Sequence, residues 1–298
     1  MNILITGSSG FVGKNLMRVL KAGHEVFGID HKESEWTDAV ADITDKKALR
    51  KNVASVNPDV IVHAAALANV EYIQMHRQEA YAINVGGTAN ILEAIKGSKT
   101  HFIFISSDYI YDGVKGNFTE ESKPNPISWY GQNKLDAEKL VERHAPHLIL
   151  RPTVIFGWDP GGKNFFMQLL ENQRALRLMR VPKDQISNPT YVELLAEIVE
   201  KSIAKKLTGA YIATGPESMD RYTFGLAICE VFGLDTSLLA PVTTKELEQV
   251  AARPLNSSTD SSKIRRALDM DFPSLKESLR ELKGRVDTTT KQENTINA

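Results

Sequence analysis

The first half of the chain alternates short apolar runs with longer stretches whose apolar positions recur at helical spacing. The short runs are rich in branched residues and indicate strands at residues 3–6, 25–29, 60–63, 102–106 and 148–151. The longer stretches predict helices at residues 13–21, 46–55, 81–96 and 130–143. Strands and helices in alternation are typical of βαβ units, so we expect an α/β fold around a parallel sheet.

The rhythm changes after residue 155, where Gly157, Pro160, Gly161 and Gly162 mark a turn-rich crossing. Beyond it we expect helices at 165–173, 191–205, 222–232 and 274–281, and strands near 176–180 and 211–213. The residues from Arg285 on are polar and lack periodicity, which predicts a disordered tail. The expected organisation is a domain at 1–155, a smaller α/β lobe at 156–284 interleaved with the core, and a tail at 285–298.

The composition is that of an ordinary globular protein, with 298 residues, 42% hydrophobic and 24% charged. Lysine plus arginine number 36 and aspartate plus glutamate 37, so the net charge of −1 provides no basic field for nucleic acid or a membrane surface. One cysteine, Cys229, excludes an intramolecular disulfide and a cysteine-based zinc cage. A reducing, cytoplasmic location is therefore expected, and no metal ligand set is identified.

A glycine loop follows the first predicted strand, in the run Thr-Gly-Ser-Ser-Gly-Phe-Val-Gly at residues 6–13. In a Rossmann unit such glycines allow a tight turn and a close approach of the backbone to a pyrophosphate, which the next helix N-terminus attracts. A P-loop is excluded, because Ser8 stands at its first glycine and Asn15 at its metal-binding hydroxyl. The loop therefore predicts dinucleotide contacts from Gly7, Gly10, Phe11, Val12 and Gly13.

Acidic residues follow the loop at two places. Asp30 ends the second strand, where a carboxylate accepts hydrogen bonds from the adenosine ribose and repels a 2′-phosphate, which favours NAD. His31 and Lys32 come next and could pair with a 2′-phosphate, so the predicted cofactor is NAD(H) or NADP(H). Asp42-Ile43 falls where the next crossover passes the adenine; alternatively, Asp42 or Asp45 caps the helix that begins nearby.

Tyr130 and Lys134 lie one turn apart on one face of a predicted helix. A neighbouring ammonium favours the phenolate and would lower the tyrosine pKa, giving an acid usable near neutrality. Upstream, a strand runs into Ser106 and Ser107, which places hydroxyls at the carboxyl edge of the sheet, where doubly wound folds bind ligands. A serine there can hydrogen-bond the substrate oxygen that the tyrosine protonates.

The order of these motifs, a glycine loop, then Ser-Ser-Asp, then Tyr-x-x-x-Lys, resembles the extended short-chain dehydrogenase/reductase family. The resemblance implies that Ser107 donates to the substrate oxygen, Tyr130 is the general acid/base, and Lys134 holds the nicotinamide ribose. His63 is more typical of a packed strand end than of a catalyst. Matches after the third strand and in the following helix imply further cofactor contacts from Ala64, Ala65, Ala66 and Asn84.

Longer matches, over about residues 1–282, are similar to the dTDP-4-dehydrorhamnose reductase family. They lie at residues 106–113, 119–121 and 124, 184–185 with 189–190, and 253–257. The family implies a Rossmann-type doubly wound sheet and NAD(P)H-dependent reduction of a nucleotide-linked 4-keto-6-deoxy sugar, in dTDP-rhamnose and polysaccharide biosynthesis. It places Asp108, Val154 and Arg253 at the substrate; Arg253 suits the diphosphate, with a surface ion pair as the alternative.

Four departures from the family pattern leave the sugar open. Ser107 replaces a threonine, Val154 stands where a tryptophan is usual, and the loop between Gln185 and Pro189 lacks its glycine. The acidic cluster after the alanine stretch is reduced to Glu71. The oligomeric state is also open, a homodimer included.

Two other functions remain as alternatives. One is an epimerase or dehydratase of the same superfamily acting on a nucleotide sugar; a dehydratase, however, carries an acidic pair where this chain has Asp108 and Tyr109. The other is a non-catalytic subunit, because the regulatory subunit of eukaryotic methionine adenosyltransferase resembles the same reductases. Intact Ser107, Tyr130 and Lys134 favour an enzyme.

Overall fold

A seven-stranded parallel sheet forms the centre of the molecule, in a computed structural model that describes residues 1–296, and the side chains of residues 1–288. The strand order is β11-β6-β5-β4-β1-β2-β3, and every neighbouring pair is parallel. The order reverses between β1 and β4, which makes the crevice at their carboxyl ends the expected ligand site. The strands are β1 (Asn2–Thr6), β2 (Glu25–Asp30), β3 (Ala39–Val40), β4 (Val60–His63), β5 (His101–Ile105), β6 (His147–Arg151) and β11 (Gly209–Ile212).

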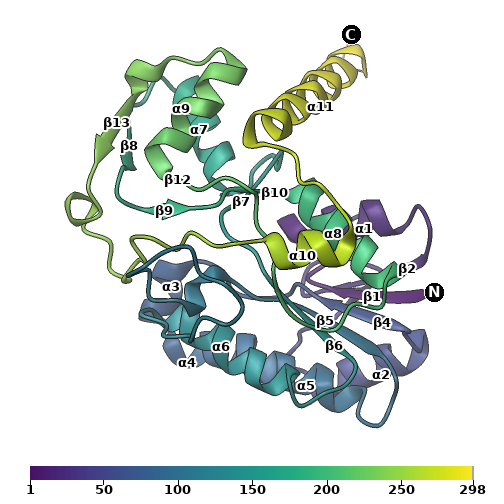
Figure 1. Cartoon of the computed structure of the whole chain (residues 1–298). Helices are drawn as coiled ribbons and strands as arrows, with labels where there is room; N and C mark the ends of the chain where they lie inside the picture. The colour runs from purple at the N-terminus through teal and green to yellow at the C-terminus, as the bar shows by residue number, and fades with distance from the viewer. Residues whose placement is uncertain (297–298) are drawn as a thin grey trace.

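Helices cover both faces of the sheet (Figure 1), so the predicted doubly wound Rossmann-type fold is confirmed. One face packs against α1 (Phe11–Leu20), α8 (Val192–Ala204) and α10 (Ser262–Leu268). The other packs against α2 (Lys46–Val56), α5 (Gly87–Ala94) and α6 (Trp129–Val141). The central strands β4 and β5 are buried along their whole length, as continuous apolar runs predict.

The predicted helix at 81–96 is interrupted in the structure. Its first part is a π-helical turn, η1 (Ala82–Gly86), and only the rest forms α5. Short helices α3 (Val70–Met75) and α4 (Arg77–Tyr81) precede it, and a 3₁₀ turn, η2 (Asp108–Ile110), follows β5. π-helical turns occur often at functional sites, and this one carries Asn84, whose side chain is described below.

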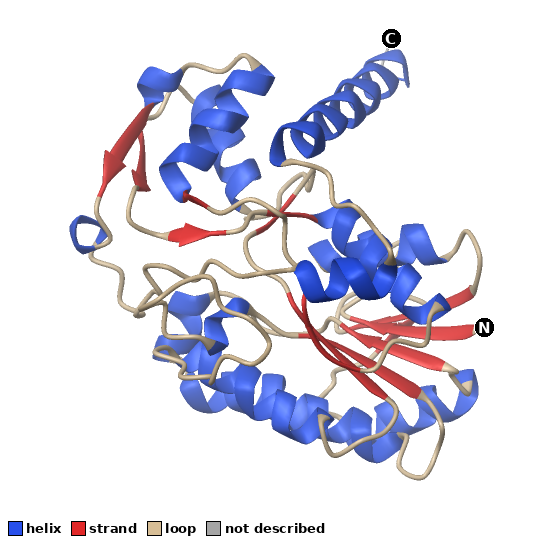
Figure 2. Cartoon of the chain, viewed as in Figure 1, coloured by secondary structure: helices blue, strands red, loops and turns tan. Residues whose placement is uncertain are grey.

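The second lobe consists of two helices and short strand pairs (Figure 2). Its helices are α7 (Phe165–Arg174) and α9 (Arg221–Phe232), with the 3₁₀ turns η3 (Thr236–Leu238) and η4 (Lys245–Leu247). The strand pairs are β7 (Ile155–Phe156) with β10 (Thr190–Tyr191), β9 (Ile186–Ser187) with β12 (Met219–Asp220), and β8 (Met179–Pro182) with β13 (Leu239–Val242). The chain returns to the sheet between these pieces, since β11 lies beside β6.

The last helix, α11 (Leu275–Ile296), continues well past the expected end at residue 281. The predicted disorder from Arg285 is therefore wrong for residues 285–296, and residues 297–298 lie outside the described residues. Arg285 pairs with Glu281 one turn earlier, at 2.9 Å, and with Glu193 of α8, at 2.8 Å. Val286 packs against the main core. Tertiary contacts thus stabilise a helix that its own polar sequence does not predict.

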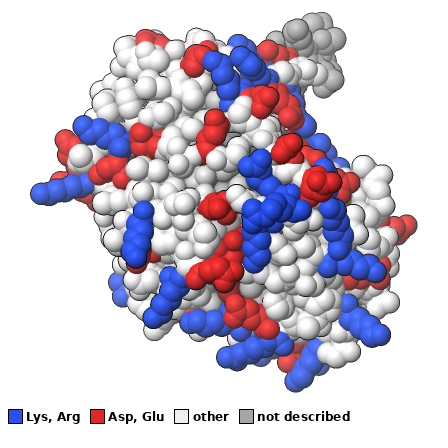
Figure 3. All heavy atoms as spheres, in the orientation of Figure 1, with Lys and Arg blue, Asp and Glu red and all other residues white. Residues whose placement is uncertain are grey.

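Positive and negative side chains are interspersed over the face drawn in Figure 3, in keeping with the balanced composition. Among the residues that the structure describes, no helix combines the length and the apolar character needed to cross a membrane.

Candidate active site

The glycine loop folds where a side chain has no room. Gly7 has φ of +74°, and a Cβ on it would lie 2.6 Å from the Ala65 nitrogen. A Cβ on Gly13 would lie 1.9 Å from the Gly7 oxygen. Gly10 precedes the first turn of α1 and offers no side-chain cap, which leaves backbone N–H groups for an anion. The loop thus fits the pyrophosphate of a dinucleotide.

A cavity of about 340 Å³ opens beside this loop. It is lined by Gly7, Ser9, Gly10, Ile29, Asp30, His31, Lys32, Ala41, Asp42, Ile43, Ala64, Ala65, Ala66, Leu67 and Ile83. The lining includes most residues predicted for the cofactor, brought together from the carboxyl ends of β1, β2 and β4. Among the residues predicted to contact the cofactor, those outside the lining are Phe11, Val12, Gly13, Asn84, Tyr130 and Lys134. A glycine loop with the Asp30 carboxylate beside it suits a dinucleotide.

Asp30 connects the cavity wall to the loop. Its carboxylate accepts the Ser9 N–H at 3.0 Å and the Lys32 N–H at 3.3 Å, and lies 2.8 Å from Nδ1 of His31. The side chain is buried, so its oxygens have fixed directions. Because His31 and Lys32 line the same cavity, both a ribose hydroxyl and a 2′-phosphate would meet complementary groups here.

The sequence left open whether the acidic residues before α2 lie at the cofactor or cap the helix, and the structure gives Asp42 and Asp45 different roles. Asp45 caps α2 by accepting the N–H groups of Lys47 and Ala48, whereas Asp42 lines the cavity and binds the Thr44 N–H at 2.7 Å. The hydrogen bonds from Thr44 hold the pKa of Asp42 below its usual range.

Asn84 supports the cavity from behind. Its amide accepts the Leu67 N–H at 2.8 Å and donates to the Leu67 carbonyl at 3.0 Å, as a strand partner would. Leu67 follows directly on the three alanines that line the cavity. Asn84 therefore positions that segment, and its own amide is occupied by the protein backbone.

Close backbone packing brings Ser107 and Tyr130 together. Ser107 follows β5 and accepts the Tyr109 N–H at 3.2 Å, which starts η2. A Cβ on Gly131, the third residue of α6, would lie 2.0 Å from the Tyr109 oxygen, so α6 rests directly on η2. The rings of Tyr109 and Tyr130 meet edge to face, 5.4 Å apart, and Ser128 caps α6 through the Gly131 N–H.

Burial raises the pKa of Tyr130, and interaction with the Ser107 hydroxyl offsets part of that rise. The predicted lowering of this pKa by Lys134 is therefore wrong in this structure. The Lys134 ammonium instead donates to the Ile105 carbonyl at 2.8 Å and lies 4.9 Å from the centre of the Phe104 ring. Burial also lowers the pKa of Lys134 to about 8, at which the amine is still mainly protonated at neutral pH. Tyr130 is a phenol that keeps its proton at neutral pH.

Asp108 is buried between the two lobes. Its Oδ1 accepts the Ser107 hydroxyl at 3.1 Å, and its Oδ2 accepts the Ser257 hydroxyl at 2.6 Å. Burial raises the pKa of the carboxyl group. Both oxygens thus have protein partners, and Asp108 links η2 to the predicted substrate segment at 253–257.

Arg253 reaches the first lobe from that segment. Its Nη2 donates to Oε1 of Glu71 at 2.7 Å, and its Nη1 lies 3.5 Å from the Tyr109 hydroxyl. The other oxygen of Glu71 accepts the N–H groups of Val250 and Ala251. The ion pair considered as an alternative for Arg253 thus exists, but it is inside the molecule, since only 11% of the arginine side chain is exposed.

Val154 lies at the crossing between the lobes, with φ of +43°, a left-handed conformation that β-branched residues rarely adopt. Its carbonyl accepts the Thr190 N–H at 3.2 Å, and its side chain packs against the main core. The sequence marked it only as a replaced tryptophan. The sequence did not single out Arg221, the first residue of α9, whose guanidinium lies 5.1 Å from the centre of the Phe165 ring. Nothing in its own segment distinguishes this arginine from any other first residue of a helix.

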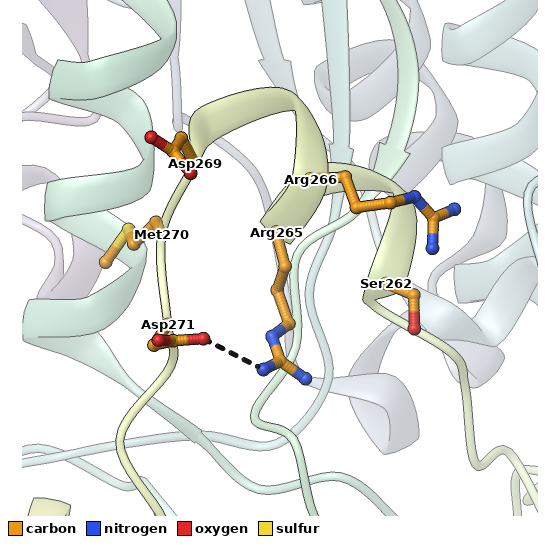
Figure 4. Close-up of a pocket in the computed structure, with 6 residues that line it drawn as sticks. All are labelled: Ser262, Arg265, Arg266, Asp269, Met270 and Asp271. Atoms are coloured by element: carbon orange, nitrogen blue, oxygen red, sulfur yellow. Dashed lines mark hydrogen bonds and ion pairs between the residues drawn. The ribbon is translucent and has the colours of Figure 1, made fainter.

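Two further features lie outside this constellation. His63 is buried between the hydroxyls of Thr6, at 2.6 Å, and Thr88, at 3.0 Å, and burial lowers its pKa to about 3. It is a packed strand end, in keeping with its sequence context. A cavity of about 380 Å³ lies beside α10 (Figure 4) and shares no residue with the glycine-loop cavity. Its Arg265 already pairs with Asp271, at 3.4 Å. In the part of the chain described, no group of three His, Cys, Asp or Glu could hold a metal.

Known proteins share this architecture along nearly the whole chain. The chain is 31% identical over 280 residues to a dTDP-4-dehydrorhamnose reductase of Aggregatibacter actinomycetemcomitans, covering 89% of this chain and 92% of that protein. It is 28% identical over 271 residues to methionine adenosyltransferase 2 subunit beta of Danio rerio, covering 88% and 83%. A crystal structure of dTDP-4-dehydrorhamnose reductase from Bacillus anthracis in complex with NADP superposes with a TM-score of 0.88 at 28% identity, over 95% of this chain and 98% of that one. The family model described as the RmlD substrate binding domain matches residues 1–287, and the chain therefore belongs to that family.

Proposed function

We propose that the protein reduces a nucleotide-linked 4-keto-6-deoxy sugar with NAD(P)H, as a dTDP-4-dehydrorhamnose reductase does. One observation carries the proposal: the Ser107 hydroxyl and the Tyr130 phenol meet at the carboxyl edge of the sheet, where a glycine-lined dinucleotide cavity also opens. The relative from Aggregatibacter bears that name, and the related Bacillus anthracis structure contains NADP.

The bound nicotinamide would supply the hydride. Ser107 would turn its one hydroxyl proton from the Asp108 carboxyl, to which it donates in this structure, to the keto oxygen, and Tyr130 gives its proton to that oxygen as charge develops on it. Burial keeps the phenol protonated, so the donor is in the required form at neutral pH. Lys134, fixed by the Ile105 carbonyl, lies one turn along α6 and holds the nicotinamide ribose.

The two lobes divide the task. Residues 1–155 hold the cofactor and the acid/base pair, and the segments between 156 and 284 that leave the sheet select the sugar through Arg253 and the backbone around Val154. A cytoplasmic location and a homodimer form part of the proposal. Size-exclusion chromatography with light scattering measures the assembly.

The test is NADH and NADPH oxidation by the purified protein against a panel of nucleotide-linked 4-keto sugars. Wild-type protein is expected to reduce one of them, and Tyr130→Phe to lose about 10²-fold or more of kcat while still binding NADP⁺. Tyr191→Phe is the matched control. Its phenol is also buried, its hydroxyl has no partner among the described residues, and its loss is expected to leave kcat unchanged.

Two outcomes contradict the proposal. If Tyr130→Phe turns over as fast as wild type, the phenol is not the acid. If no sugar is reduced while the purified protein recovers a methionine adenosyltransferase catalytic subunit at equal stoichiometry, the protein is a binding subunit, as its similarity to the Danio rerio protein would then indicate. Tightly bound NAD with no net oxidation of added cofactor would indicate an epimerase or dehydratase instead.

A further inference from the structure

A second arginine of the smaller lobe, Arg221, is held beside Arg253 by the strand pair β9 and β12. β12 ends at Asp220 and pairs with Ile186 of β9, and the Arg221 N–H donates to the Gln185 carbonyl at 3.1 Å. On its other side β9 bridges to Asn256, and the Ser257 N–H donates to the Ile186 carbonyl at 2.9 Å. The start of α9 and the segment that carries Arg253 thus flank the same short strand.

The Arg221 guanidinium is half-buried and makes no hydrogen bond or ion pair with any residue between 1 and 288. Its guanidinium carbon lies 5.1 Å from the centre of the Phe165 ring. Burial lowers the pKa of Arg221, and the groups that act on its charge are the Tyr109 hydroxyl, the Asp108 carboxyl and the Arg253 guanidinium. A partly desolvated cation beside a second cation is unfavourable unless an anion joins them.

The nearby carboxylates of Asp108 and Glu71 form no ion pair with Arg221. Both oxygens of Asp108 already accept hydroxyls, from Ser107 and from Ser257. Glu71 pairs with Arg253 and with two backbone N–H groups of the same segment. Arg221 and Arg253 therefore lie close enough for each guanidinium to act on the other's charge, and Glu71 pairs with Arg253 alone.

We infer that Arg221 and Arg253 together bind the diphosphate of the sugar-nucleotide substrate, with Arg221 providing a cation that the protein itself leaves unpaired. A diphosphate carries two negative charges and presents paired oxygens, which guanidinium groups bind in bidentate fashion. The Phe165 ring holds the Arg221 guanidinium by a cation–π contact and limits its motion. The substrate class rests on the proposed function, whereas the anion site rests on Arg221 and its surroundings.

Binding of inorganic pyrophosphate and of dTDP to protein saturated with NADP⁺, measured by calorimetry, tests the inference. Saturation blocks the cofactor's own pyrophosphate site. Arg221→Met is expected to weaken both ligands about 10- to 100-fold, in line with the loss of one charge-assisted contact. Arg221→Lys should fall between wild type and Arg221→Met, because a lysine keeps the charge and loses the bidentate geometry. Arg174→Met, at an exposed arginine of the same lobe, is the matched control and should leave both affinities unchanged.

Equal affinities in wild type and Arg221→Met overturn the inference, as does a wild type that binds neither pyrophosphate nor dTDP. A merely structural role predicts a lower melting temperature in both Arg221 variants without a selective loss of the diphosphate ligands. Thymidine, which carries no phosphate, and NADP⁺ should bind all variants alike. If wild type reduces no 4-keto sugar but loses pyrophosphate affinity on Arg221→Met, the proposed reaction fails and the anion site stands. If reduction is seen and affinity does not change, the anion site alone fails.

Discussion

The two lobes of the molecule are built on different principles. In the sheet lobe, long parallel strands pair in register and bury continuous apolar runs, and the helices beside them repeat their apolar positions every turn. In the second lobe two of the three strand pairs have only two residues per strand. Side chains there hold distant backbone: Asp184 accepts the Thr244 N–H at 2.8 Å, and Asn188 accepts the Thr259 N–H at 2.9 Å.

Under the proposed function, the sheet lobe carries the chemistry and the second lobe carries the recognition of the sugar. Packing against an extended sheet fixes a backbone in one place, which suits an acid/base pair that has to meet a reacting atom within a fraction of an ångström. The second lobe instead joins short strands and loops through side-chain hydrogen bonds such as those of Thr244 to Asp184, and loops tolerate changes of residue better than the elements they connect. A lobe of that kind is suited to different sugars on one cofactor platform.

Gly131→Ala has the largest expected effect and tests the close packing of α6 against η2 in the sheet lobe. Its Cβ would lie 2.0 Å from the Tyr109 oxygen, so α6 has to move away from η2 and carry Tyr130 away from Ser107. We expect kcat to fall about 10²-fold, as displacement of a catalytic group by about 1 Å costs, with NADP⁺ affinity changed far less. Gly284→Ala, at a helical glycine with open space around it, is the control and should preserve kcat. Unchanged kcat in Gly131→Ala would show that α6 has room to adjust.

A second prediction concerns acid stability of the sheet lobe. Burial lowers the pKa of His63 from 6.5 to about 3. Between these two pH values the imidazole is protonated in the unfolded chain and neutral in the folded chain. The contribution of His63 to the free energy of unfolding should therefore be constant above pH 6.5. It should fall by about 1.4 kcal/mol per pH unit as the pH drops from 6.5 toward 3. Urea unfolding of wild type and His63→Gln between pH 7 and 4 measures this, with the difference between their unfolding free energies narrowing at low pH. A difference independent of pH would mean that folding does not lower the pKa of His63.

Glu71→Gln is the mildest change and tests the polar link between the lobes. A glutamine can still accept the backbone N–H groups of residues 250 and 251 but loses the charge that neutralises Arg253. We expect pyrophosphate to bind about three- to tenfold more tightly, since an opposing charge near the anion is removed, with little change in melting temperature because the glutamate side chain is 34% exposed. Glu93→Gln, at a surface pair with Lys96, is the control. Weaker pyrophosphate binding by Glu71→Gln would show that the carboxylate orients Arg253 and does not compete for it.

Sequence periodicity and motif order predicted the sheet, most of the helices that cover it, and the glycine loop, because each depends on neighbours within one turn or one strand. The same reasoning predicted that Lys134 and Tyr130 share a helix face. It did not predict the position of the Lys134 ammonium, which donates to the carbonyl of Ile105, 29 residues earlier in the chain. Arg221 gave no signal, since its significance comes from β9 and Arg253 rather than from its own segment. The end of α11 was missed for a similar reason: Glu193, on another helix, pairs with Arg285.

Val154 adopts a left-handed backbone with a branched side chain, a combination that costs about 1–3 kcal/mol relative to an unstrained residue. Glycine or asparagine would adopt the same φ at lower cost. Valine at this position therefore lowers the stability of the folded chain at the junction of the lobes. The branched side chain packs against the main core at this junction, a contact that glycine would not make.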